Sequence, residues 1–361
     1  MEEPDWQAQV LALAPDFCAE GYQRLNPDVV QLGLDPYQHY IQWGRFQRRV
    51  WYEETVMDAE PRFNLNLVPG RSVLLLACAQ PVLAQSVEFK ELCATWAQSH
   101  NVIVLQLSPE DFGLDQTSVA GYVVCEAAQY GYLDAQRLLD ALLQQTPIEG
   151  AVVYGMRAKT LLMPLAERRL PTLSYMDYKQ ARGTSFYGLQ EVFLRSTYTV
   201  LESETTWTLC RLHLPQLNAM YAPVLPETPE VAWWDKLFLS AQHQIDQENA
   251  DLQTILQSDV FDSAFFQVET AVTDTATASV SYMRAWRSRI DVRKPKVGFH
   301  PALYADAVAI EGGEDPFAHY LRAGQPAGPW SFTVIDQYSS LQAVPESVAL
   351  HLHAYYPEML A

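Results

Sequence analysis

Through the middle of the chain, short runs of consecutive apolar residues alternate with longer segments whose apolar residues recur at helical spacing. The clearest runs are Val73–Cys78 and residues 102–107, which have strand length and are apolar almost throughout. Such strands belong inside a sheet that is covered on both faces. Further strands are predicted at residues 151–154, 172–175, 198–201 and 217–221, and a weaker one at residues 119–125.

The segments between these strands predict helices at residues 86–99, 133–145, 158–168, 187–195 and 203–212. Short connections that carry a helix require right-handed crossovers between parallel strands. The pattern therefore predicts an α/β fold, in which residues 68–225 form a doubly wound, mostly parallel, Rossmann-like domain.

Two segments outside this region repeat one another. Residues 17–44 and 299–324 each begin with Phe, carry Tyr five positions later, and end in Asp-Pro-aromatic-x-His-Tyr-aliphatic-x-x-Gly. The matching positions are Asp35, Pro36, Tyr37, His39, Tyr40, Ile41 and Gly44 in the first copy, and Asp315, Pro316, Phe317, His319, Tyr320, Leu321 and Gly324 in the second.

Each copy is expected to form a small helical hairpin. Asp35 and Asp315 are candidate N-caps, the following proline fits a first helical turn, and Gly44 and Gly324 are candidate left-handed C-caps. In the first copy, a second helix is expected to start at Asn26.

Aromatic spacing predicts how the first hairpin packs. Tyr37, Tyr40 and Ile41 share one helical face and should pack against the preceding helix. His39 and His319 could be functional, but their matched placement favours a structural role in bracing each hairpin.

The remaining segments divide the rest of the chain. A long helix is predicted at residues 231–257, a linker at 271–281, and a short basic helix with a solvated face at 282–290. The predicted domains are a hairpin region at 1–67, the α/β domain at 68–225, a long helix and linker at 226–290, the second hairpin at 291–335, and the start of a truncated downstream domain at 345–361.

Charge excludes some partners. The chain carries 24 Lys and Arg against 43 Asp and Glu, a formal charge of −19, so it should repel nucleic acid and anionic lipid headgroups. No apolar run approaches the roughly 20 residues of a membrane helix. We expect a cytoplasmic protein without a transmembrane segment, while peripheral association with the inner membrane stays open.

The loops at the carboxyl ends of the predicted strands are where a doubly wound sheet binds ligands. The loop after Cys78 has neither a dinucleotide-binding nor a P-loop glycine pattern, and no cofactor or metal is expected. Polar candidates follow later strands: Asp177 as a base or sugar-hydroxyl contact, and Arg157 as an anion contact. Ser203 and Glu204 are equally explained as an N-cap and a first-turn acid.

The α/β region resembles the N-terminal, acceptor-side half of GT-B glycosyltransferases. The resemblance rests on residues 101–104 (NVIV), 170–175 (LPTLSY), 198–204 (YTVLESE) and 217–224 (LNAMYAPV). The hairpin pattern is similar to repeats in large bacterial polysaccharide glycosyltransferases, including rhamnan-synthesis proteins, and residues 348–360 resemble the start of a rhamnan synthesis F domain.

The chain also departs from these families. It has no pair of glutamates eight positions apart in a donor half, no Asp-x-Asp, and no glycine-rich acceptor loop after Cys78. The nucleotide-sugar half is therefore expected to be absent, degenerate or part of a downstream domain.

The resemblance implies part of a glycosyltransferase for bacterial cell-surface polysaccharide (O-antigen, capsule or rhamnan-like), moving sugar from a nucleotide sugar to a glycan acceptor. The alternative is a non-catalytic scaffold or acceptor-binding module that works with a downstream glycosyltransferase domain. The implied site comprises Asp177 as the catalytic candidate, with Tyr154, Arg157, Tyr178, Ser203 and Glu204 as substrate-binding candidates.

Overall fold

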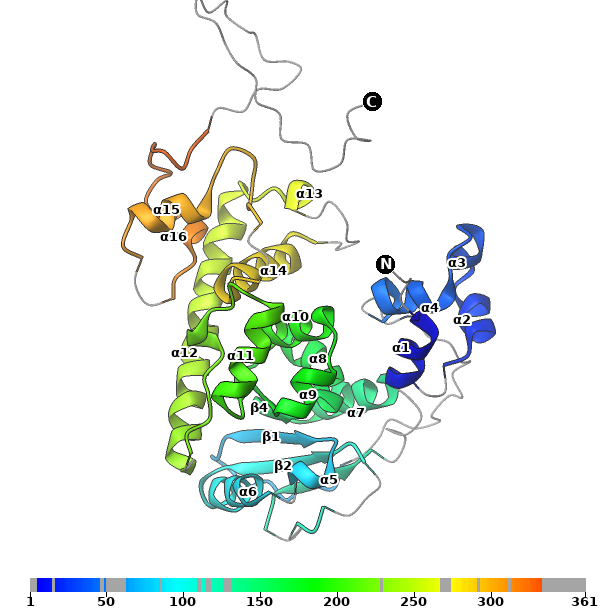
Figure 1. Ribbon diagram of the computed structural model, residues 1–361. Helices are drawn as coiled ribbons and strands as arrows, with labels where there is room; N and C mark the ends of the chain where they lie inside the picture. Colours follow the sequence, from blue (N-terminus) through cyan, green and yellow to red (C-terminus); the bar gives the residue numbers. More distant parts are fainter. Residues whose placement is uncertain are drawn as a thin grey trace, which may run out of the picture.

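A six-stranded sheet, parallel throughout, forms the centre of the computed structural model (Figure 1). The structure describes residues 5–14, 17–45, 49, 63–84, 86–108, 112–114, 118–125, 132–227, 230–266, 274–290, 293–310 and 313–332. The strands are β1 (Val73–Cys78), β2 (Asn101–Gln106), β3 (Gly121–Val124), β4 (Ile148–Tyr154), β5 (Thr172–Met176) and β6 (Tyr198–Leu201).

The order across the sheet is β3-β2-β1-β4-β5-β6, so the chain starts at the centre and builds outward first to one side and then to the other. This order is typical of doubly wound α/β sheets. The predicted α/β architecture with a parallel sheet is confirmed. The predicted start of a downstream domain at 345–361 lies outside the described residues.

Both faces of the sheet are buried, as the continuous apolar runs predict. Leu75 and Ile103 face one apolar cluster, and Leu74 and Val104 face another on the opposite side. The first face is covered by α7 (Tyr132–Gln145), η3 (Met156–Leu161), α8 (Leu162–Glu167), α9 (Tyr178–Gly183), α10 (Phe186–Arg195) and α11 (Glu204–His213). The second face is covered by α5 (Pro81–Ala84), α6 (Val87–Ser99) and part of α12 (Val231–Ser258).

One predicted strand is wrong. Residues 217–221 contain a 3₁₀ helix, η4 (Ala219–Tyr221), and only Val224 makes an isolated bridge to β6. Asn218 causes the turn, because its side chain accepts a hydrogen bond from the amide of Met220 and donates one to the carbonyl of Arg287. The segment is therefore held by a distant helix instead of by the sheet.

Helix α12 joins the sheet to the rest of the molecule. Near its start Trp234 is buried against Tyr154, with ring centroids 5.8 Å apart. Its second half packs against α14 (Thr275–Ser288) and α16 (Pro316–Arg322), with α13 (Ser263–Phe266) and α15 (Pro301–Ala307) nearby. None of the described helices combines the length and the hydropathy needed to cross a bilayer.

The predicted linker at 271–281 is wrong from residue 274 onward, and residues 271–273 lie outside the described residues. Asp274 caps α14 by accepting a hydrogen bond from the amide of Thr277. Ala278 and Ser279 are fully buried. Their small side chains serve close helix packing, which explains why a small, polar sequence does not form a linker here.

The two repeats share a last helix that starts at Asp-Pro and an aromatic centre packed against it. The first comprises α2 (Ala19–Leu25), α3 (Pro27–Gln31), α4 (Pro36–His39) and the π-helical η1 (Tyr40–Gly44), preceded by α1 (Trp6–Leu13); α15 and α16 form the second. The centroids of Phe17 and Tyr40 are 4.8 Å apart at 40°, and those of Phe299 and Tyr320 are 4.3 Å apart at 33°. The matched repeats in the sequence are therefore matched in shape.

Each histidine braces its hairpin, as the structural interpretation predicts. The hydroxyl of Tyr22 lies 2.8 Å from Nδ1 of His39, and that of Tyr304 lies 2.7 Å from Nδ1 of His319. Burial of the imidazole, together with the nearby charge of Arg49, lowers the pKa of His39. The neutral imidazole suits a hydrogen bond with a buried tyrosine.

The capping predictions hold with one exception. Asp35 accepts a hydrogen bond from the amide of Gln38, Asp315 caps α16, and Gly324 has the expected left-handed φ of +76°. Gly44 is not a left-handed cap, because it lies inside η1. A Cβ at Gly44 would lie 1.8 Å from the hydroxyl of Tyr22, so this glycine is needed for close packing.

We expect Tyr22→Phe and Tyr304→Phe each to lower the free energy of unfolding by about 1 kcal/mol, because each removes one hydrogen bond and keeps the ring. Chemical denaturation measures the change. Tyr187→Phe is the control, since Tyr187 is 63% exposed. Equal stability of all three variants would contradict a bracing role.

Candidate functional site

At the carboxyl edge of the sheet, the loops after the neighbouring strands β1 and β4 run to opposite sides of the sheet, and side chains meet at the point where they diverge. Gln80 follows β1 and Gly155 follows β4, and the side-chain amide of Gln180 donates a hydrogen bond to that of Gln80 across this point. Gly155 has a φ of +89°, and a Cβ there would lie 2.9 Å from both the Gln180 amide nitrogen and a methyl of Leu83. Among the described residues, Gln80, Leu83 and Gln180 therefore place side chains at the point where such a sheet usually binds its ligand.

Asp177 and Tyr178 lie together beside this edge, after β5. Asp177 is the N-cap of α9 in a capping box: its carboxylate accepts from the amide of Gln180 at 2.7 Å, and its own amide donates to the Gln180 side chain. The amide of Tyr178 donates to the carboxylate of Glu202 at 3.0 Å, which connects the ends of β5 and β6.

Ser203 and Glu204 start α11 after β6. The hydroxyl of Ser203 accepts a hydrogen bond from the amide of Thr206 at 3.3 Å, and Glu204 is exposed in the first turn. Ser203 therefore is the N-cap of α11, and Glu204 is an acidic residue in its first turn, as the structural interpretation of these two residues predicts.

The two other candidates differ from these. Tyr154 is 2% exposed and packs edge-on against Phe89 with ring centroids 4.8 Å apart, so it belongs to the core below α6 and α12. Arg157 lies in η3, and its side chain is outside the described part of the structure. The predicted residues thus gather as two neighbouring pairs, with Tyr154 set apart.

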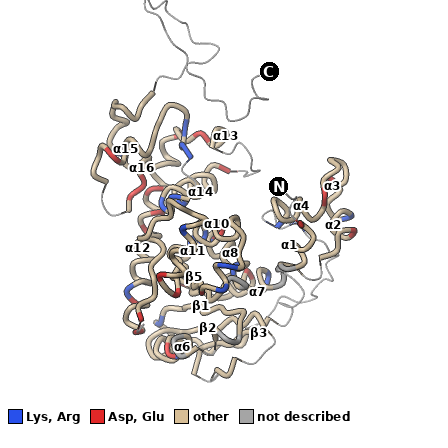
Figure 2. Tube along the Cα trace, in the orientation of Figure 1, with Lys and Arg blue, Asp and Glu red and all other residues tan. Residues whose placement is uncertain are grey.

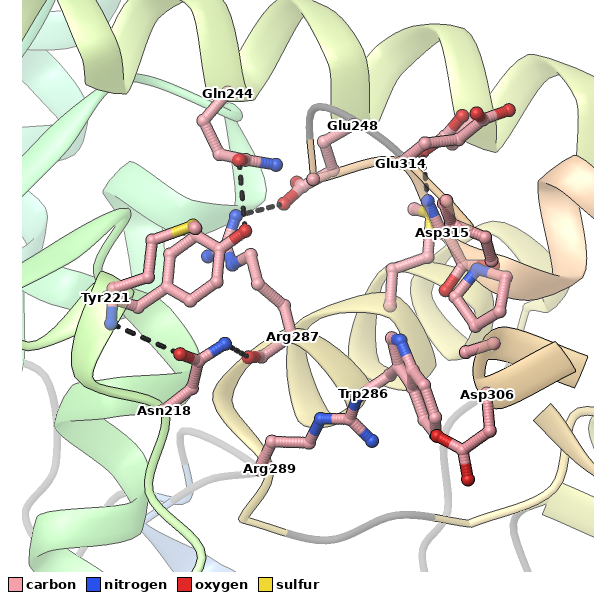
Figure 3. Close-up of a pocket in the computed structure, with 17 residues that line it drawn as sticks. Asn218, Tyr221, Gln244, Glu248, Trp286, Arg287, Arg289, Asp306, Glu314 and Asp315 are labelled. Atoms are coloured by element: carbon pink, nitrogen blue, oxygen red, sulfur yellow. Dashed lines mark hydrogen bonds and ion pairs between the residues drawn. The ribbon is translucent and has the colours of Figure 1, made fainter. Parts of the chain in front are cut away.

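A cavity of about 320 Å³ lies elsewhere, between α12, α14 and the second hairpin (Figure 3). None of the site residues predicted from the sequence lines it. Its wall combines residues that are far apart in sequence, namely Asn218, Met220, Tyr221, Gln244, Glu248, Asp251, Met283, Trp286, Arg287, Arg289, Ala305, Asp306, Ile310, Gly313, Glu314, Asp315 and Pro316.

A buried ion-pair cluster lies at one side of the cavity, where basic and acidic residues meet as α14 packs against α12 (Figure 2). Glu248 is 4% exposed. Its carboxylate accepts hydrogen bonds from two nitrogens of Arg284, at 3.0 Å and 2.7 Å, and from Nη1 of Arg287 at 3.3 Å. Burial alone would raise the pKa of Glu248, but the two guanidinium groups outweigh it and hold that pKa below its usual value.

The prediction of a solvated basic face is therefore wrong for Arg284 and Arg287, which are both buried. Arg287 also donates to the carbonyl of Ser196 at 3.3 Å, and its guanidinium carbon lies 4.9 Å from the centre of the Tyr221 ring. Hence α14 is attached both to α12 and to the segment that enters β6.

Arg289 follows Arg287 on the same side of the cavity, and the two residues form its basic wall. Arg289 ends α14 with a left-handed φ of +58°, and its guanidinium carbon lies 3.9 Å from the centre of the Trp286 ring. Trp286 and Arg289 both line the cavity.

Acidic residues form the opposite wall. Asp251 accepts hydrogen bonds from the amide of Asp315 at 2.9 Å and from Nη2 of Arg322 at 2.6 Å, and Arg322 also pairs with Glu314. Burial raises the pKa of Asp315 to about 8. Asp306 is exposed at the rim of this wall.

The chain matches no protein-family model, and no curated protein matches it. Within the described ranges, no group of three or more His, Cys, Asp or Glu side chains is arranged to hold a metal ion.

We expect Glu248→Gln to lower the free energy of unfolding by about 3 kcal/mol, because it leaves two buried guanidinium groups without a counter-charge. Asp246→Asn is the control, since Asp246 is exposed on the same helix, and it should change stability by less than about 0.5 kcal/mol. Urea denaturation compares them, and equal effects would contradict the importance of the buried cluster.

Stability should also decrease with rising pH. With its pKa raised from 3.8 to about 8, Asp315 keeps a proton in the folded state that the unfolded chain releases. Between these two values, each pH unit should therefore cost up to about 1.4 kcal/mol. Asp315→Asn keeps the cap acceptor, and it should flatten the pH dependence of the denaturation midpoint between pH 5 and pH 8. An unchanged slope would contradict a protonated Asp315.

Proposed function

We propose that this chain is the acceptor-side part of a glycosyltransferase for bacterial cell-surface polysaccharide, which transfers sugar from a nucleotide sugar to a glycan acceptor. The observation that carries the proposal is the parallel sheet in the order β3-β2-β1-β4-β5-β6. It supports a Rossmann-like domain of the kind that forms one half of a GT-B enzyme.

The motif segments support the same proposal. Residues 101–104 belong to β2, residues 170–175 lead into β5, and residues 198–204 run through β6 into α11. The loops after β5 and β6 therefore meet at the carboxyl edge, with Asp177 and Tyr178 beside Ser203 and Glu204. Catalysis at such an edge would consist largely of positioning and of stabilising the departing diphosphate.

A second candidate is a non-catalytic scaffold or acceptor-binding module of a larger glycosyltransferase. The hydrogen-bonded amides of Gln80 and Gln180 favour it, because they fill the point at which a doubly wound sheet normally admits its ligand. The absence of a glycine-rich loop after Cys78 in the sequence favours it as well.

Binding and transfer assays on the purified chain separate the two candidates. If the chain is catalytic, a panel of nucleotide diphosphate sugars should include one that raises the thermal unfolding midpoint, because a ligand that binds the folded state stabilises it. The same sugar should be transferred to a glycan acceptor. No thermal shift and no transfer with any donor would overturn catalysis by this chain and favour the scaffold.

Asp177→Asn tests the catalytic candidate, because asparagine is also a good N-cap and should keep α9 intact. If Asp177 acts as a base, transfer should fall by about 10²-fold or more. Asp246→Asn, on the exposed face of α12, is the matched control and should leave transfer unchanged. Equal rates in both variants would remove Asp177 from the catalytic role.

A further inference from the structure

The cavity between α12, α14 and the second hairpin has walls of opposite charge (Figure 3). On the α14 side, Glu248 is shared by Arg284 and Arg287, which leaves an excess positive charge. Arg289 adds to it. On the other side, Asp251 of α12 and Glu314 beside the second hairpin share Arg322, which leaves an excess negative charge. Asp306 adds to that one.

Arg287 carries a donor that the protein does not satisfy. The residue is 8% exposed and lines the cavity, and its Nε has no hydrogen-bond acceptor within the described part of the chain. Buried donors almost always have a partner, and one without a partner calls for an explanation. Because this Nε is itself buried, we assign Arg287 the role of a positive charge behind the cavity wall, and not of a direct hydrogen-bond contact to a ligand.

The side chain of Arg289 is restrained in a way that suits recognition of an anion. The residue ends α14 with a left-handed φ, and its amide donates a hydrogen bond to the carbonyl of Trp286 at 3.1 Å. The stacked indole restrains the guanidinium plane. A restrained guanidinium presents paired N–H donors that match the two oxygens of a carboxylate.

The opposite wall favours hydroxyl groups. Ionised carboxylates accept hydrogen bonds and do not donate them, so Asp306 and Glu314 suit a ligand with O–H donors. The side chains of Asn218 and Gln244 add amide groups on the side of Tyr221 and Arg287. A volume of about 320 Å³ is at the small end of the range for ligand pockets and suits one small polar molecule.

We propose that this cavity binds a sugar residue that carries a carboxylate, as a uronic acid does. Its carboxylate would pair with Arg289 and face Arg287, and its ring hydroxyls would donate to Asp306 and Glu314. Placing this sugar within an acceptor polysaccharide rests on the proposed function. Affinity for the free acidic sugar does not, so the two can fail separately.

Calorimetric titration of the full chain tests the site with three probes: glucuronate, glucose and glucose 6-phosphate. Glucuronate should bind at least tenfold more tightly than glucose, because only it supplies the carboxylate. If glucose 6-phosphate binds as tightly as glucuronate or more tightly, the carboxylate assignment is overturned in favour of a phosphate site. Absence of glucuronate binding would overturn the proposal even if sugar transfer is found.

Variants then locate the binding. Arg289→Gln should weaken glucuronate binding at least tenfold and leave glucose binding unchanged. Arg211→Gln is the matched control, because Arg211 is an exposed arginine that also stacks on a tryptophan, Trp207, away from the cavity. Asp306→Asn, at an exposed position that tolerates substitution, should weaken glucuronate binding several-fold through the hydroxyl contacts. Equal affinity in the wild type and in both cavity variants would refute the site.

Discussion

The carboxylate of Glu248 controls how the C-terminal half of the molecule is assembled. It lies between two arginines of α14, and one of these, Arg287, also reaches the carbonyl of Ser196 just before β6. A single buried anion thereby connects α12, α14 and the edge of the sheet. Such clusters cost desolvation and contribute little net stability, but misaligned packing would leave charges buried and unpaired. We interpret the cluster as a device that selects one packing of α14 on α12.

Much of the α/β fold can be predicted from local pattern, because strands buried on both faces are apolar throughout. Val73–Cys78 shows this directly, since all six residues are buried and the observed strand has the predicted bounds. Pattern fails where a distant group decides the structure. Residues 217–221 have strand-like composition, yet hydrogen bonds from Asn218 to the end of α14 bend them into a 3₁₀ turn.

The cavity could not be found by the same reasoning. Arg284 and Arg287 have the spacing of a solvated helix face. They are buried because they pair with Glu248, which lies 36 residues before Arg284 in the sequence. Sequence distance conceals that pairing. At the sheet edge, by contrast, position after a strand was sufficient to bring Asp177 and Tyr178 together near Ser203, whereas Tyr154 at the end of β4 faces inward because side chains alternate along a strand.

The matched hairpins keep the same aromatic centre in different surroundings. Asp315 and Ala318 are buried beneath α12 and α14, whereas the equivalent Asp35 is exposed and Gln38 stands in place of the alanine. The Phe, Tyr and His side chains inside the two units nevertheless keep the same arrangement. The interior of the unit is thus insulated from its exterior. In a hairpin of this kind, the outer residues can change to fit a different neighbouring element while the aromatic centre keeps the fold of the hairpin.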